Sequence, residues 1–170
     1  GKVKLYRGDA SIVADELEMT GTGQNSRPRA KGNVFSTLNN LRVWADALDY
    51  NEPGRTAIYT GRVTGQKQDI KMQSAKMTVT AQESQNAVSK IVSEGNVVVK
   101  RGSSSGRGDQ ATYEAATQQI LITGSKAEFS GPEGLTAAPR ITLNVAGNRM
   151  AIAESGQQQA VTKYKVPKKD

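Results

Sequence analysis

The sequence predicts an all-β protein built by stacking antiparallel repeats of about 30 residues, and three observations support this prediction. Apolar and polar residues alternate in many short segments, clusters of turn-forming residues separate these segments, and one pair of motifs recurs four times. An alternation with a period of two places one apolar row on one face of a β-strand.

The predicted strands follow from this alternation. Residues 21–29, 51–54, 102–108, 131–134 and 147–148 are rich in Gly, Pro, Asn and Ser and are expected to be turns. A helical period with capping residues is lacking, and residues 10–17 are expected to form a short turn at most. The apolar positions that alternate are Val3/Leu5, Leu17/Met19, Leu41/Val43, Ile70/Met72, Met77/Val79, Val97/Val99, Ile120/Ile122, Ile141/Leu143/Val145 and Met150/Ile152.

The repeat is defined by two motifs at a fixed distance. Gly-x-Val triplets begin at Gly1, Gly32, Gly61 and Gly95, and a second signature starts 13 residues after each Gly, at Ala14, Ala45, Ser74 and Gly108. One such unit cannot bury its apolar row alone, so stacked units should form one continuous inner face. A fifth unit, 124–156, breaks the offset and is expected to cap the stack.

Composition excludes several classes of function. The 170 residues are 36% apolar and 5% aromatic, which indicates a thin core, and the net charge is +7. Without Cys or His, the chain has no thiolate nucleophile, no imidazole base and no zinc site of the usual kind. We therefore predict no enzymatic activity, no catalytic residues, no metal ligands and no cofactor. A run of about 18 apolar residues, as in a membrane helix, is absent.

Three other motifs favour ordinary structural roles. Arg107-Gly108-Asp109 spells an adhesion tripeptide but falls on the repeat signature. The glycine- and serine-rich segment 102–106 lacks the Lys-Ser/Thr ending of a phosphate-binding loop and is expected to be a mobile hairpin loop. The carboxylates Asp15, Glu16, Asp46, Asp49 and Asp109 recur with the repeat, which favours exposed strand faces over an acid/base pair.

The repeat resembles the LptA/OstA-like proteins of the lipopolysaccharide transport system. The resemblance rests on Gly32-Asn33-Val34, on Ala45-Asp46-Ala47-Leu48-Asp49-Tyr50, and on the Gly-x-Val that follows, and it extends from Gly1 to about Tyr113. The periplasmic domain of LptC and the N-terminal domain of LptD share the pattern. The Asp of the signature is replaced by Ala75 in the third repeat, which argues against an essential chemical role for it.

This resemblance implies an antiparallel β-jellyroll, opened into a V-shaped trough and located in the periplasm. Such a protein binds the acyl chains of lipopolysaccharide and joins end to end with itself or with related proteins into a bridge between the two membranes. We expect a single domain, 1–156, followed by a basic tail, 157–170. The chain begins with Gly rather than Met, and its natural N-terminus is expected to have been processed or trimmed.

The inward apolar row is open to two interpretations, a packed core or a groove for flexible chains. Aliphatic side chains and Met suit the groove because they adapt to irregular partners. The lipid-binding positions predicted on this basis are Leu17, Met19, Leu48, Ile70, Met72, Met77, Val97 and Ile120.

A basic cluster, Arg27, Arg29 and Lys31, is predicted to form a rim that attracts the phosphates of lipid A. No aromatic stacking platform accompanies it, so we expect no nucleic-acid partner. The alternatives are the periplasmic domain of an LptC-like membrane-anchored component, a packed structural β-solenoid, and a basic nucleic-acid binder.

Overall fold

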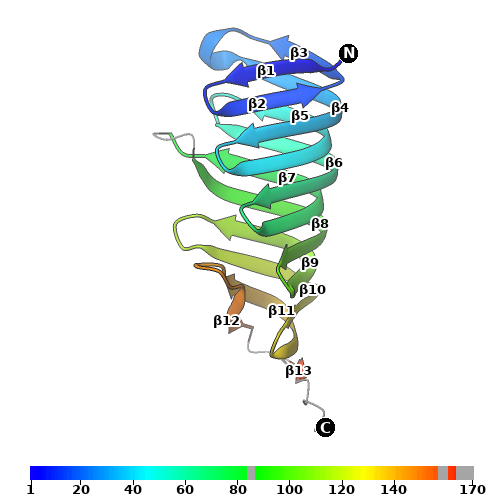
Figure 1. Ribbon diagram of the computed structural model, residues 1–170, viewed down its shortest axis with the longest axis vertical. Helices are drawn as coiled ribbons and strands as arrows, with labels where there is room; N and C mark the ends of the chain where they lie inside the picture. The colour runs from blue at the N-terminus through cyan, green and yellow to red at the C-terminus, as the bar shows by residue number, and fades with distance from the viewer. Residues whose placement is uncertain (84–86, 157–160, 164–170) are drawn as a thin grey trace.

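The computed structural model describes residues 1–83, 87–156 and 161–163. In these ranges, thirteen strands form a single antiparallel sheet, and one short 3-10 helix, η1 (Gly23–Asn25), connects β3 to β4. Figure 1 shows the strands stacked along the long axis, with β1–β3 at one end and β12 and β13 at the other. The all-β, antiparallel prediction is confirmed. The strands are β1 (Val3–Arg7), β2 (Ala10–Ala14), β3 (Glu16–Thr20), β4 (Arg27–Leu38), β5 (Leu41–Asn51), β6 (Thr56–Lys67), β7 (Ile70–Ala81), β8 (Val88–Arg101), β9 (Ser104–Glu114), β10 (Gln119–Gly131), β11 (Gly134–Asn144), β12 (Ala151–Ser155) and β13 (Val161–Lys163).

The long strands β4 to β11 each contribute to two walls of the molecule. Wall A contains β1, β2 and β13 together with 34–38, 41–45, 63–67, 70–74, 97–101, 104–107, 128–131 and 134–138. Wall B contains β3 and β12 together with 27–31, 47–51, 56–60, 76–81, 88–94, 110–114, 119–123 and 140–144. The sheet is therefore bent along its length into an open, jellyroll-like trough.

The Gly-x-Val motif is the bend between the walls. Lys31 pairs with Ala47 and Val34 with Ala45, so Gly32 and Asn33 face the single residue Asp46 in a β-bulge. Register shifts recur at the other pairings of the long strands. The Gly and the residue after it have positive φ angles in the second, third and fourth copies of the motif. The constant spacing within the repeats thus aligns the bends in one seam.

The Asp of the repeat signature packs against the bulge glycine of the next repeat. A Cβ atom on Gly61, whose φ is +76°, would lie 2.5 Å from Asp46 Oδ2. Arg62 Nη2 and Nε donate to the two oxygens of Asp46 at 2.6 and 3.1 Å, and these hydrogen bonds lower the pKa of that carboxyl group. In the third repeat, Ala75 takes the place of Asp beside Gly95. The Asp therefore has a structural role at the seam.

Several expected turns are strands. Residues 10–14 form β2 and residues 16 and 17 begin β3, with a bend at Asp15 between them. β4 already begins at Arg27, where the edge strand β3 provides a pairing partner. The segment 102–106 is no mobile loop, because β9 begins at Ser104 and pairs with β8. Gly106 lies so close to Ile122 Cδ1 that a Cβ atom would clash with it. Glycine there permits close packing rather than mobility.

The fifth unit continues the stack. Thr123 pairs with Arg140 and Ala127 pairs with Ala138, so the three residues 124–126 lie opposite the single residue Pro139. The bulge between β4 and β5 has two residues opposite one. Gly124 also lies against an Asp of the repeat signature, because a Cβ atom on it would be 2.9 Å from Asp109 Oδ2. The predicted tail, 157–170, lies outside the described residues except for β13, which pairs with β11. The division into domain and tail remains a prediction.

Candidate functional site

A cavity of about 330 Å³ lies between the two walls near the N-terminal end of the trough. Its size falls within the range of about 300–1,000 Å³ that is typical of small-molecule sites. Wall A contributes apolar side chains from β1, β2 and β4, and wall B contributes them from β3 to β7. The apolar lining consists of Leu5, Ala10, Ile12, Met19, Pro28, Leu38, Leu48, Ala57, Val79 and Ala81.

A hydrogen bond between two residues that line the cavity joins wall A to wall B. Ser36 Oγ of wall A and Tyr59 Oη of wall B lie 2.5 Å apart, and both residues are buried. Burial raises the pKa of Tyr59 to about 12, while the hydrogen bond from Ser36 opposes this shift. The tyrosine therefore stays neutral at ordinary pH. Both residues also line the cavity.

Charged side chains lie where the cavity opens. Arg7, the last residue of β1 in wall A, forms an ion pair with Glu52, which follows β5 at the end of wall B. Arg7 Nη1 lies 2.5 Å from Glu52 Oε2. Arg55, across the β5–β6 turn from Glu52, donates through Nη1 to the carbonyls of Gln82 and Glu83 at 3.2 and 2.7 Å. Burial, and then the adjacent Glu52 carboxylate, raise the pKa of Tyr50.

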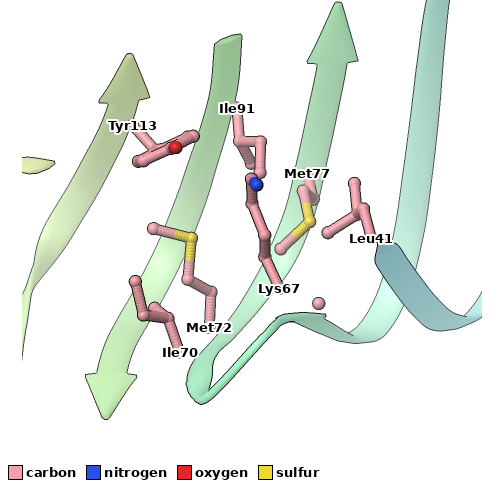
Figure 2. A pocket seen from close by; sticks show the side chains of 8 residues that line it. Leu41, Lys67, Ile70, Met72, Met77, Ile91 and Tyr113 are labelled. Atoms are coloured by element: carbon pink, nitrogen blue, oxygen red, sulfur yellow. The ribbon is translucent and has the colours of Figure 1, made fainter. Parts of the chain in front are cut away.

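The middle of the trough is packed. Figure 2 shows the side chains of both walls gathered around one pocket. The space between them is only about 10 Å³. Met77 is fully buried there, and Met72 is 4% exposed. Lys67 extends over this cluster, with its Nζ atom 6.0 Å from the centre of the Tyr113 ring and 3.3 Å from Asn40 Oδ1. This part of the apolar row is core.

Arg101 closes the C-terminal part of the trough. Its side chain is 5% exposed, and its Nε donates to Asp69 Oδ2 at 2.8 Å, which lowers the pKa of Asp69. Nη1 donates to the carbonyls of Val145 and Arg149 at 2.8 Å, and Nη2 donates to that of Gly147. A residue of wall A thus holds the loop that follows the last long strand of wall B.

The predicted lipid-binding residues divide between these regions. Leu48 and the 51% exposed Met19 line the cavity of about 330 Å³. Ile70, Met72 and Met77 line the small space in the packed middle. Val97 and Ile120 are buried in the core, and Leu17 is half-buried against it. The structure does not bring the eight residues into one groove, and their contact with lipid remains a prediction.

The predicted phosphate-binding residues lie on the outward face of wall B. Arg27, Arg29 and Lys31 are exposed, whereas the alternating residues Pro28 and Ala30 are buried. Arg29 Nε donates to Asp49 Oδ2 on the neighbouring strand at 3.0 Å. Their role in binding phosphate also remains a prediction.

The sequence pattern does not predict the charged residues at the mouth of the cavity. Arg7 belongs to the first hairpin, whereas Glu52 and Arg55 belong to the turn between β5 and β6. Residues this far apart carry no common spacing motif. The residue type alone, an Arg at the end of a predicted strand, is too frequent to mark a site.

Comparison with known proteins identifies the family. The model of a family described as LptA/(LptD N-terminal domain) LPS transport protein matches residues 42–149. The chain belongs to this family. The match covers β5 to β11 and therefore most of the bulged strands that form the two walls. The predicted membership of the LptA/OstA-like group is confirmed, and with it a place in lipopolysaccharide transport.

A solved structure of a related component has the same fold. The crystal structure of LptH, the LptA-homologous periplasmic component of the lipopolysaccharide transport device from Pseudomonas aeruginosa, superposes with a TM-score of 0.64. The similarity covers 74% of this chain and 95% of that chain, at 12% sequence identity. No curated protein sequence matches the chain.

Among residues 1–83, 87–156 and 161–163, the structure contains no helix that is long and apolar enough to cross a membrane. In the same ranges, no three His, Cys, Asp or Glu side chains are grouped so that they could hold a metal ion.

Proposed function

We propose that this protein is a non-enzymatic lipopolysaccharide-binding protein of the periplasm, which carries or bridges lipopolysaccharide from the inner to the outer membrane. The observation that supports it is the apolar cavity between the walls of an LptA-like trough. Each methylene group transferred from water into such a cavity contributes about 0.8 kcal/mol, so an acyl chain of about a dozen carbons gains on the order of 10 kcal/mol before the costs of binding.

The inward face of the N-terminal end is the proposed binding surface. Leu48 is 4% exposed and faces the cavity, whereas Ile58, one strand away, is 36% exposed on the outer face. Leu48 pairs with Tyr59 and Asp49 pairs with Ile58, so the two test positions are close but lie on opposite faces of wall B.

Photo-cross-linking tests this function. A photo-reactive leucine analogue is placed at position 48 or 58, and the full chain is irradiated with purified lipopolysaccharide. We expect cross-linked lipid from position 48 and little from position 58. Equal yields from both positions, or none from position 48, would reject the proposal and favour a packed structural module.

We further propose that copies of this chain, or related bridge proteins, join end to end. Within wall B, every neighbouring pair from β3 to β12 is antiparallel, so these two end strands run in opposite directions. If one copy is stacked on the next, β12 can pair with β3 in the antiparallel manner that β-strand addition uses. Because the two edges differ, the contact is heterologous and generates open filaments.

A further inference from the structure

The mouth of the N-terminal cavity combines an apolar interior with two arginines from opposite walls. Arg7 is the last residue of β1 in wall A, and Arg55 lies in the β5–β6 turn at the end of wall B. Both side chains line the same cavity of about 330 Å³ as Leu5, Leu38 and Leu48. The Arg7 side chain is 62% exposed, so its guanidinium group is accessible to a ligand at the opening.

Glu52 pairs with Arg7, whereas Arg55 uses its Nη1 atom for the carbonyls of Gln82 and Glu83, and no hydrogen bond of Arg55 Nε or Nη2 is found among the described residues. The Glu52 side chain is only 17% exposed, and its Oε2 atom lies 2.5 Å from Arg7 Nη1. This carboxylate is the group that an incoming anion would replace as the partner of Arg7. The three side chains together carry a charge of +1, from two arginines and one glutamate, which attracts an anion to the opening.

Tyr50 lines the same cavity as Glu52 and the two arginines. Its pKa is raised by burial and by Glu52, and the positive charges of Arg7 and Arg55 oppose that shift. The geometry that places both guanidinium groups at this opening is the shared cavity lining. The planar guanidinium group of Arg matches the geometry of a phosphate oxygen pair, so two of them at one opening favour a phosphate over a neutral sugar.

We propose that Arg7 and Arg55 form a head-group subsite for the phosphate monoester of an acylated lipid whose chain occupies the cavity, and that Glu52 masks this subsite in the empty protein. The inference rests on the proposed lipid-carrying function and adds the group that recognises the ligand. It places the phosphate at the cavity mouth, on the opposite face of the sheet from Arg27 and Lys31. The ion pair between Arg7 and Glu52 joins the two walls, so phosphate binding also releases one contact across the mouth.

The experiment uses three probes and the full chain. Dodecyl phosphate carries both the chain and the phosphate, dodecyl maltoside carries the same chain with an uncharged head, and inorganic phosphate carries no chain. Binding is measured by isothermal titration calorimetry at low salt, below the micelle concentration of each detergent. For the wild-type protein, we expect dodecyl phosphate to bind most tightly and inorganic phosphate to bind least.

The variants separate the subsite from general charge and from misfolding. Arg7→Gln and Arg55→Gln should each weaken binding of dodecyl phosphate by about fivefold and leave dodecyl maltoside unchanged. Glu52→Gln should strengthen dodecyl phosphate binding by about threefold, an effect that a damaged fold cannot produce. The control variants Arg27→Gln and Lys31→Gln remove the same charge from the outer face and should change binding less than about twofold.

Each other outcome overturns the subsite. If Arg7→Gln and Arg55→Gln leave dodecyl phosphate binding unchanged while both detergents bind, the subsite is rejected and the lipid-carrying function stands. If the outer-face variants weaken binding as much as the mouth variants do, general attraction explains the effect. If inorganic phosphate binds as tightly as dodecyl phosphate, the site is a free-phosphate site. If neither detergent binds, the proposed function itself fails, and the subsite with it.

Discussion

The hydroxyl groups of Ser36 and Tyr59 lie 2.5 Å apart and form a hydrogen bond that joins wall A to wall B at the cavity. Both residues are buried, Ser36 at 3% and Tyr59 at 4% exposure. A buried hydroxyl group that loses its partner costs about 1–3 kcal/mol. This bond therefore connects the stability of the fold with the shape of the candidate binding site.

Removing one partner of this pair should destabilise the fold. Tyr59→Phe leaves the Ser36 hydroxyl group buried without its partner, and we expect a loss of about 1–3 kcal/mol in the free energy of unfolding. Ser36→Ala combined with Tyr59→Phe should cost less than the sum of the two single changes. Urea denaturation measures these values. Tyr6→Phe serves as a control, because Tyr6 is 68% exposed. Additive losses would contradict a direct interaction.

Tyr59 should also make stability fall at alkaline pH. Its pKa is about 12 in the folded protein, against an ordinary value of 10. Between these values the unfolded chain releases the proton first, so the free energy of unfolding should decline by about 1.4 kcal/mol per pH unit from this residue. Burial also raises the pKa values of Tyr50 and Tyr113. Tyr59→Phe should thus reduce the alkaline slope without abolishing it; an unchanged slope would contradict the assignment.

Two glycines with positive φ angles, Gly8 in the β1–β2 turn and Gly61 in a β-bulge, should tolerate alanine differently according to their neighbours. Gly8 and Gly61 both have positive φ angles, but only Gly61 approaches another side chain, that of Asp46. Gly8→Ala should cost only the backbone term of about 1–2 kcal/mol, and Gly61→Ala should cost clearly more. Asp46→Ala should relieve part of the Gly61→Ala loss, measured by thermal and urea denaturation. Equal losses at the two glycines would show that the Asp46 contact has no effect.

Carboxylates placed along the apolar row should distinguish core from cavity. Met77→Asp buries an unpaired charge in the packed middle and should prevent folding. Leu48→Asp lies at the cavity, so we expect a folded chain that no longer binds a fluorescent acyl probe. Thr78→Asp, one residue out of phase with Met77, should bind the probe normally. Circular dichroism reports the fold in each variant, and equal loss of probe binding from Leu48→Asp and Thr78→Asp would contradict the assignment of inner and outer faces.

End-to-end assembly can be tested with cysteines, since the natural chain has none. Met19 in β3 pairs with the buried Pro28, and Ile152 in β12 pairs with the buried Leu143, so both lie in inward rows of wall B. Mixing a Met19→Cys chain with an Ile152→Cys chain under mild oxidation should yield a disulfide-linked pair. Each variant alone should yield little.

The assembly experiment has a control and a clear negative result. Ile58→Cys, exposed in the middle of wall B, should not cross-link to either end. Light scattering of the unmodified chain should show a mass that rises with concentration without stopping at the dimer. A chain that stays monomeric and forms no mixed disulfide would contradict assembly and favour the LptC-like alternative.

The candidate site was predicted only in part. Leu48 and Met19 were expected in a groove and do line the cavity. Met77 and Ile120 obey the same alternation but are packed. A period of two tells which residues face inward, and it carries no information about the distance between two inward faces. That distance depends on the side chains of the opposite wall, such as Tyr113 and Ile91 against Met77.

The sequence by itself determined the all-β class, the alternation within most strands and the repeat, because these depend on neighbours within a few residues. It also marked the bends, since Gly32, Gly61 and Gly95 recur where two successive residues need positive φ angles. Only the tertiary structure decided where the trough is open and where it is filled. Arg7 meets Glu52, and Arg101 reaches Gly147, across 45 and 46 positions of the chain. Such contacts follow from the bending of the sheet, which brings the two walls together, and no local pattern encodes them.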